Sequence, residues 1–106
     1  MLYQIYFYVP VNKKDQVKES MFAAGAGRIG YYQRCSFETF GTGQYEPMQG
    51  SQAYQGAIGK LEICEEIKVE MVCEESKLAH VISAMKLSHP YEEVAFGTFP
   101  INSYFN

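Results

Sequence analysis

One stretch near the middle of the chain decides the fold: Lys60-Leu61-Glu62-Ile63-Cys64-Glu65-Glu66-Ile67-Lys68-Val69-Glu70-Met71-Val72-Cys73-Glu74. Its odd-numbered positions are almost all apolar, whereas its even-numbered positions are mostly Glu or Lys. An alternation of period two predicts a β-strand with one buried face. At about 3.3 Å per residue this strand would be on the order of 45 Å long, more than one small domain can cover. We therefore expect another copy of the same chain to cover the overhanging part.

The rest of the chain predicts five further elements. Together with the central stretch they follow the order strand, helix, strand, strand, helix, strand, and cover residues 2–9, 13–24, 31–40, 60–74, 77–88 and 91–101. Tyr, Phe, Ile and Val indicate the strands, and apolar residues at intervals of three and four indicate the helices. Two split crossovers in this order give an antiparallel four-stranded sheet with both helices on one face. We therefore expect a single α+β domain over residues 1–106, a ferredoxin-like βαββαβ sandwich, whose other sheet face carries Tyr and Phe and favours self-association.

Local signals mark the ends of these elements. The first strand is apolar on both faces and is expected to be central, and Asn12 is the expected N-cap of the first helix. Ser76 is expected to begin the second helix, which Pro90 prevents from continuing. Pro100 favours an edge position for the last strand. The glutamates of the central strand are expected to form a solvated face, some of them paired with Arg34 across the second and third strands.

Composition and charge exclude several classes of partner. The net charge is -3, and the nine Lys and Arg residues are spread along the chain, whereas a nucleic-acid surface needs a clustered basic face. The longest apolar run is only a few residues, too short to span a membrane. The first residues lack the basic region and the cleavage site of an export signal. Together with three widely spaced cysteines, expected to be reduced thiols, these features predict a cytoplasmic protein without nucleic-acid or membrane partners.

One glycine motif resembles a nucleotide-binding fingerprint. Gly25-Ala26-Gly27-Arg28-Ile29-Gly30 matches the pattern G-x-G-x-x-G. In dinucleotide sites these glycines follow a strand and open a helix, so that the helix N-terminus meets the pyrophosphate. Here the predicted helix precedes the motif and the predicted strand follows it. The motif is therefore interpreted as a helix stop followed by a tight turn.

Few residues are candidates for metal binding or catalysis. His89 lies at a helix-to-strand junction and is followed by Tyr91-Glu92-Glu93. A histidine beside acidic residues can bind a divalent ion, so His89 and Glu92 are candidate metal ligands, although a capping or solvated histidine is the simpler interpretation. His80, on the second helix, is expected to be exposed. With only two histidines, no Ser-His-Asp or Cys-His arrangement is visible, and no catalytic residue is predicted.

The three cysteines are not expected to form a common site. Cys64 and Cys73 have opposite parity on the same predicted strand, so their side chains leave opposite faces and cannot share an ion within one subunit. Cys35 is expected on the face of Tyr31 and Phe37, as a buried and inert thiol.

Several spaced motifs carry a family resemblance. They are Gly27-x-Ile29-Gly30-x-Tyr32-x-x-Cys35-Ser36-Phe37, Gly41-x-Gly43-x-Tyr45-x-Pro47-x-x-Gly50, Gly56-x-x-Gly59-x-x-Glu62 and His89-Pro90-Tyr91-Glu92-Glu93-Val94-Ala95-Phe96. Over nearly its whole length the chain resembles the domain inserted in the middle of the Nif-three-like (NGG-one-interacting-factor-three, YqfO-type) proteins. This resemblance implies a fold of the nitrogen-regulatory PII and CutA type with an extended central hairpin. It also implies a trimer, in which long hairpins reach across to neighbouring subunits.

The resemblance also directs attention to particular positions. Larger members of the family carry this domain between two halves that hold a dinuclear metal site of His, Asp and Glu. No position of this sequence matches those ligands, so the hydrolase-like activity sometimes attached to the family is not carried over. Among the matched positions, His89 and Glu92 are candidates for ion binding. The long connection between the second and third strands is the candidate ligand or partner loop, and its matched positions are Gly41, Gly43, Tyr45, Pro47, Gly50, Gly56 and Gly59.

Three functions are compatible with these observations. The first is a non-enzymatic, trimeric module of the PII/CutA type that binds a small ligand or regulates a protein partner. The second is a divalent-metal-binding protein of ion homeostasis that uses His89, Glu92 and Cys35 across an interface. The third is an accessory subunit of a metal-dependent hydrolase. The first is preferred because the expected fold and the long glycine-rich connection favour it and no catalytic set is visible.

Overall fold

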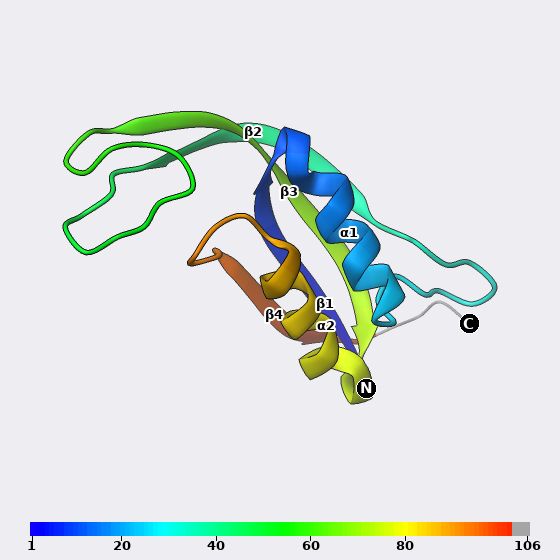
Figure 1. Cartoon of the computed structure of the whole chain (residues 1–106). Helices are drawn as coiled ribbons and strands as arrows, with labels where there is room; N and C mark the ends of the chain where they lie inside the picture. The colour runs from blue at the N-terminus through cyan, green and yellow to red at the C-terminus, as the bar shows by residue number, and fades with distance from the viewer. Residues whose placement is uncertain (103–106) are drawn as a thin grey trace.

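The computed structural model describes residues 1–102. It shows a four-stranded antiparallel sheet with two α-helices on one face (Figure 1). The elements are β1 (Leu2–Pro10), the 3-10 turn η1 (Val11–Lys13), α1 (Lys14–Ala23), β2 (Phe37–Tyr45), β3 (Glu62–Glu74), α2 (Glu75–Ser88) and β4 (Phe96–Ile101). The strands lie in the order β2-β3-β1-β4, so β1 is central and β4 is an edge strand, as predicted. The expected ferredoxin-like α+β fold is confirmed.

The core lies between the sheet and the helices and follows the alternation of the central stretch. The odd-numbered residues of β3 from Ile67 onward are buried, and they face the odd-numbered residues of β1. The buried residues of the helices are spaced four apart, Val17 with Met21 on α1 and Val81 with Met85 on α2. Each fully buried side chain of this size stabilises the fold by about 1.5–3 kcal/mol relative to an exposed one. The period-two and helical patterns therefore identify the core correctly over most of the chain.

The strand β3 is longer than the sheet that supports it. β1 ends opposite Glu66, so residues 62–65 of β3 pair with β2 alone. Together with residues 42–45 of β2 and the connection 46–61, they form a projection that we call the arm (Figure 1). The molecule is correspondingly elongated, with extents of 49 × 24 × 23 Å. The predicted overhang is thus present.

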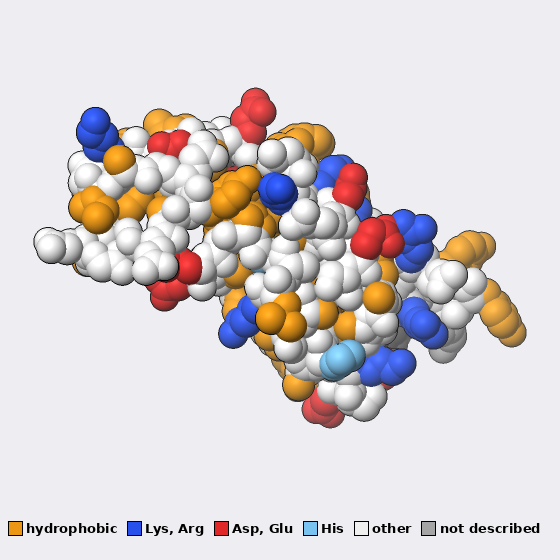
Figure 2. Space-filling view, in the orientation of Figure 1, with side chains coloured by type: hydrophobic (Ala, Val, Ile, Leu, Met, Phe, Trp, Pro, Cys, Tyr) orange, Lys and Arg blue, Asp and Glu red, His pale blue; other side chains and the backbone are white. Residues whose placement is uncertain are grey.

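The arm exposes side chains of the type that is buried elsewhere. Ile63 continues the face of Ile67 and Val69, yet it is 59% exposed whereas Ile67 is fully buried. Leu61, just before β3, is 55% exposed, and Phe40 of β2, which pairs with Ile67 beside the arm, is 71% exposed. Figure 2 shows hydrophobic side chains gathered on this projecting part of the molecule. This exposure agrees with the expected overhang, because the helices of a single subunit do not reach this far.

The sheet face without helices is aromatic, as predicted. The ladder register places Tyr6, Phe37 and Phe99 on this face, and the ring centroids of Tyr6 and Phe99 are 6.4 Å apart. The ammonium group of Lys68 lies 5.0 Å from the Tyr6 ring centroid, a cation–π contact. Phe37 and Phe99 are exposed, so this face is only partly covered within one subunit.

The second strand begins later than predicted. Residues 31–36 lie in turns, because Gly30 and Arg34 both adopt positive φ and a two-way backbone hydrogen bond joins Ile29 to Tyr32. The strand then runs from Phe37 through two glycines to Tyr45, in unbroken pairing with β3. Arg34 pairs with Glu19 of α1 and not with a glutamate of β3, because the turn holds it away from the sheet.

Other expected boundaries are also corrected. Asn12 does not cap α1, because the chain turns directly after Pro10 into η1 and the N-cap is Lys13. The N-cap of α2 is Glu74 and not Ser76. Cys35 lies in the turn segment and is only partly buried, which contradicts the prediction of a buried thiol.

The chain ends of the described region lie next to each other. Leu2 at the start of β1 pairs with Ile101 at the end of β4. No helix among residues 1–102 is long and apolar enough to cross a membrane.

Candidate functional site

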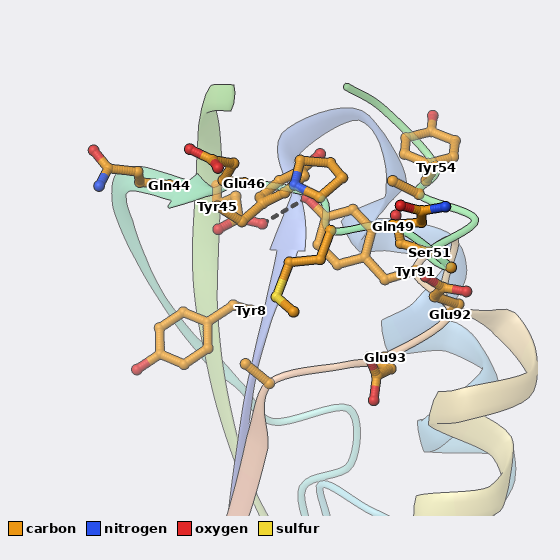
Figure 3. Close-up of a pocket in the computed structure, with 16 residues that line it drawn as sticks. Tyr8, Gln44, Tyr45, Glu46, Gln49, Ser51, Tyr54, Tyr91, Glu92 and Glu93 are labelled. Atoms are coloured by element: carbon orange, nitrogen blue, oxygen red, sulfur yellow. Dashed lines mark hydrogen bonds between the residues drawn. The ribbon is translucent and has the colours of Figure 1, made fainter. Parts of the chain in front are cut away.

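A pocket of about 660 Å³ lies under the arm, between the connection 46–61 and the loop that joins α2 to β4 (Figure 3). Its wall on the arm side includes Tyr45, Pro47 and Tyr54, and its wall on the other side includes Tyr91 and Glu92. This volume is within the range of pockets that enclose small molecules. The pocket forms because the arm folds back over the loop that follows α2.

Tyr91 links the two walls. Its hydroxyl donates a hydrogen bond to Glu66 Oε2 at 2.6 Å, and it lies 3.9 Å from the Cys64 sulfur. Its ring centroid is 6.1 Å from that of Tyr45 and 6.1 Å from that of Tyr54, with interplanar angles of 65° and 51°. Residues 91–95 were expected to begin the last strand, but they form a loop, because these contacts hold Tyr91 against the arm.

The pocket is strongly acidic. Four carboxylates line it, those of Glu46, Glu66, Glu92 and Glu93, and its lining includes no Lys or Arg from residues 1–102. Burial and the hydrogen bond to Glu66 raise the pKa of Tyr91 far above its usual value. Burial also raises the pKa of Tyr45, and nearby glutamates add to this effect. The phenols of Tyr45 and Tyr91 are therefore neutral at physiological pH, and the carboxylates give the pocket a negative charge.

The Glu66 carboxylate lies between the Tyr91 hydroxyl and the backbone of Gly43. Tyr91 binds one carboxylate oxygen, and a Cβ atom placed on Gly43 would collide with the other, Oε1. The absence of a side chain at Gly43 therefore makes room for the carboxylate. Gly43 has an ordinary φ, so its role here is close approach and not backbone freedom.

His89 fastens the loop to the sheet. It is 7% exposed, and its Nε2 lies 2.8 Å from the Tyr8 carbonyl oxygen, while its Nδ1 accepts a hydrogen bond from the Tyr91 amide at 3.1 Å. Because Nδ1 is an acceptor, Nε2 carries the proton and donates to Tyr8. Burial lowers the pKa of His89, which keeps the imidazole neutral. Protonation of Nδ1 would break the bond to the Tyr91 amide and loosen one wall of the pocket.

We expect the His89→Gln variant to lose most of the dependence of stability on pH that the wild type shows below about pH 6.5. The folded-state pKa of His89 lies below its unfolded value, so the unfolded chain binds the proton first as the pH falls. The stability that neutral His89 contributes is complete above the unfolded pKa of 6.5 and is lost as the pH falls toward the folded value. Urea unfolding of both proteins between about pH 5 and 8 measures the two slopes. Parallel slopes would contradict the assignment, and His80→Gln, at an exposed position, is the matched control.

The folded-back connection is held by its own hydrogen bonds. The Tyr45 hydroxyl donates to the Gln55 carbonyl oxygen at 2.6 Å, and the Gly59 amide donates to the Pro47 carbonyl oxygen at 2.8 Å. Across the pocket, the Gln52 amide donates to Glu92 Oε1 at 2.9 Å. The connection is therefore an ordered wall of the pocket.

The predicted metal ligands His89 and Glu92 lie on the same loop, but each already has protein partners. Both ring nitrogens of His89 are used, and Glu92 binds the connection. No group of three or more His, Cys, Asp or Glu residues in the described region 1–102 could hold a metal ion. A metal at this position would have to displace one of these hydrogen bonds, and the metal site stays a prediction.

Solved structures of other proteins share this fold. A Bacillus cereus protein described as related to NIF3 superposes with a TM-score of 0.81 at 36% identity, over 96% of this chain and 26% of that protein. The homologues of this chain are NIF3-like proteins. The periplasmic divalent cation tolerance protein CutA from Archaeoglobus fulgidus superposes with a TM-score of 0.70 at 17% identity, over 98% of this chain and 87% of that one, which shows a shared fold. The resemblance to the PII/CutA-like domain of this family is confirmed.

The curated NIF3-like relatives are larger proteins. A "GTP cyclohydrolase 1 type 2 homolog" from Halalkalibacterium halodurans is 42% identical over 100 residues, which cover 94% of this chain and 27% of the relative. The protein of the same name from Bacillus subtilis is 40% identical over 94 residues, which cover 89% of this chain and 25% of the relative. This chain thus spans about a quarter of the length of these relatives. No family model matches the chain.

The positions singled out by the NIF3-like motifs divide into two groups. Tyr45, Pro47 and Gly50 line the pocket. The others, which support the arm or its turns without lining the pocket, are Gly41, Gly43, Gly56 and Gly59.

Sequence reasoning missed Tyr8, Glu66 and Tyr91 as members of one site. Glu66 and Tyr8 have even parity on β3 and β1, so the alternation places both on the sheet face without helices. Parity shows which face a side chain lies on, but it does not show which residues of the two strands lie opposite each other, so it could not bring Glu66 and Tyr8 together. Tyr91 gave no signal of its own, because a tyrosine before a strand is as typical of the strand as of a pocket wall.

Proposed function

We propose that this chain is the subunit of a non-enzymatic, trimeric module of the PII/CutA type that binds a small ligand under its arm and, through that ligand, regulates a protein partner. The arm is the observation that carries the proposal. The arm presents Leu61 and Ile63, and β2 presents Phe40 directly beside it; all three are more than half exposed. Ile63 and Phe40 lie on the face that is buried in the rest of the sheet. Covering one such side chain stabilises an assembly by about 1.5–3 kcal/mol, so binding of a neighbouring subunit here is favourable.

The shape of the subunit is compatible with the proposed ring of copies. The arm projects from one end of the sheet, while the aromatic face of the sheet lies elsewhere on the subunit and is exposed at Phe37 and Phe99. A contact between two different patches is heterologous, and it gives a ring where the rotation between copies closes and a filament where it does not. The trimer implied by the family resemblance is one such ring.

The pocket favours binding over catalysis. Cys64 is the nearest thiol, and burial together with Glu66 and Glu62 raises its pKa, which opposes formation of the nucleophilic thiolate. The names of the larger relatives refer to GTP cyclohydrolase, but a triphosphate needs positive charge, and the described residues that line this pocket supply four carboxylates and no Lys or Arg. GTP chemistry is therefore not proposed for this chain.

We expect purified protein to have about three times the chain mass of 12.1 kDa by light scattering after size exclusion. The mass should stay constant on dilution through the micromolar range, because several apolar side chains are covered at each contact. A monodisperse monomer would remove the proposed assembly. A thermal-shift screen with small metabolites then tests ligand binding, since a ligand that is selective for the native state raises the melting temperature.

A further inference from the structure

We infer that the pocket under the arm binds a small organic cation, an amine or quaternary ammonium with an aromatic or apolar body. This inference deepens the proposed function and rests on it for the role of the site as a ligand pocket. It names the class of ligand from the charge, the rings and the free polar groups of the pocket wall.

The ion pairs of residues 1–102 leave the charge of the pocket unneutralised. They join Lys14 and Lys18 to Glu38, and Arg34 to Glu19. None of them involves a carboxylate of the pocket. A concave wall of like charge raises the local concentration of ions of opposite sign and repels anions. A ligand that carries positive charge is therefore favoured over a nucleotide or a carboxylic acid.

Three tyrosine rings provide surfaces that suit a cation. The rings of Tyr45 and Tyr54 each lie 6.1 Å from the ring of Tyr91 and are inclined to it, so they do not stack face to face on it (Figure 3). A cation within about 6 Å of a ring centroid is attracted by the π-system. The raised pKa values of Tyr45 and Tyr91 keep both rings as neutral phenols, and their hydroxyls donate to the Gln55 carbonyl oxygen and to Glu66, which fixes the positions of the rings.

Two polar atoms of the wall have no hydrogen-bond partner among the described residues. Tyr91 binds Oε2 of Glu66, and Oε1, which packs against Gly43, is the acceptor left for an ammonium group. Ser51, which also lines the pocket, has a buried hydroxyl oxygen without a hydrogen-bond partner among the described residues. Buried polar atoms without partners are uncommon and are often satisfied by a ligand or water. A preorganised acceptor next to aromatic rings costs little to bring into place on binding.

The same chemistry could come from a free amine or from a Lys side chain of a neighbouring copy. We commit to the free amine, because the pocket has the volume of a small-molecule site and is closed on two sides by the chain itself. Titration of the intact assembly distinguishes the two sources. If a neighbouring copy fills the pocket, the probe binds only after the assembly has been dissociated, and this outcome would overturn the inference.

Three probes of similar shape and different charge test the inference. They are benzylamine, benzyl alcohol and benzoate, titrated by calorimetry into the wild-type protein at low salt. We expect benzylamine to bind, benzyl alcohol to bind at least about tenfold more weakly, and benzoate to give no detectable heat. Equal binding of all three, preference for benzoate or the absence of binding by benzylamine would overturn the inference.

Matched variants identify the groups responsible. Glu66→Gln should weaken benzylamine binding by about tenfold. Glu46→Gln, at an exposed position of the wall, should weaken it by about threefold, and this variant serves as the test if Glu66→Gln does not fold. Glu65→Gln is the control, because Glu65 is exposed on the opposite side of β3 and does not line the pocket. Unchanged affinity in both pocket variants would contradict the assignment. Loss of the trimer is read separately by light scattering, so failure of the proposed function and failure of the cation site are distinguishable.

Discussion

Replacing Gly27 by alanine is expected to lower the free energy of unfolding by about 2–4 kcal/mol. Gly27 is buried and has a φ of +79°, a conformation that side-chain-bearing residues rarely adopt. A Cβ atom there would lie 2.7 Å from the Phe22 ring and 3.0 Å from the Cys35 carbonyl oxygen. The backbone cannot move aside, because the Gly27 amide donates to the Val72 carbonyl oxygen and its own carbonyl oxygen accepts from the Cys35 amide, both at 2.8 Å.

Two other glycines separate the causes of this loss. Gly50 has a φ of +99°, but no atom of the described residues lies within 4 Å of the place that its Cβ would take, so Gly50→Ala measures backbone strain alone, about 1 kcal/mol. Gly41 has neither a positive φ nor such a close neighbour, and Gly41→Ala should be near neutral. Urea unfolding followed by circular dichroism gives the three values. If Gly27→Ala lowers the free energy of unfolding no more than Gly50→Ala does, close packing around Gly27 does not contribute to the loss.

Gly27 belongs to the glycine motif at residues 25–30. The three glycines of the motif all have positive φ, and they lie in the turns that follow α1. The interpretation as a helix stop and turn accounts for each of them. The spacing matches that of a dinucleotide fingerprint, but the topology around it is reversed.

The second large effect concerns the arm. We expect Ile63→Glu to dissociate the proposed trimer into monomers that remain folded. Ile63 contributes little to the core of its own subunit, since it is 59% exposed, but in the assembly its replacement would forfeit about 2 kcal/mol of apolar burial per subunit. The introduced carboxylate would also have to be buried without a partner, which adds a further cost. Light scattering should show about one third of the wild-type mass.

An exposed apolar residue outside the arm provides the control. Leu87 on α2 is 85% exposed, and Leu87→Glu should leave the mass unchanged. Cooperative urea unfolding of Ile63→Glu would show that the subunit itself is intact. A wild-type mass for Ile63→Glu, at concentrations where Leu87→Glu also assembles, would remove the arm from the interface.

How far sequence alone reaches is clearest along β3. The alternation predicts a long strand with a buried face because side chains of a strand leave opposite faces in turn, a local rule that needs no knowledge of partners. It correctly places Val69 and Met71 in the core. The same rule assigns Ile63 to this face but does not identify what covers it, because burial depends on whether a helix or another subunit lies above that position. A single sequence does not contain that information.

The pocket illustrates a different limit. Its walls come from the connection after β2 and from the loop after α2, and neither segment has a periodic pattern. The position of Tyr91 depends on a hydrogen bond to Glu66, 25 residues away in sequence. Turn and strand propensities describe each segment separately, so they cannot predict which side chains meet. The boundaries at Asn12 and residues 31–36 were mispredicted for a related reason, since the local backbone conformation outweighs side-chain preference there.

The pairing of Leu2 with Ile101 has a consequence for evolution. Directly paired residues of antiparallel strands lie about 4.5–5.5 Å apart, so residues 2 and 101 together occupy little more room than a tight hairpin. A host protein could accept residues 2–101 at one surface loop without stretching its own chain. Such a unit is suited to grafting, which fits its match to only about a quarter of each larger relative.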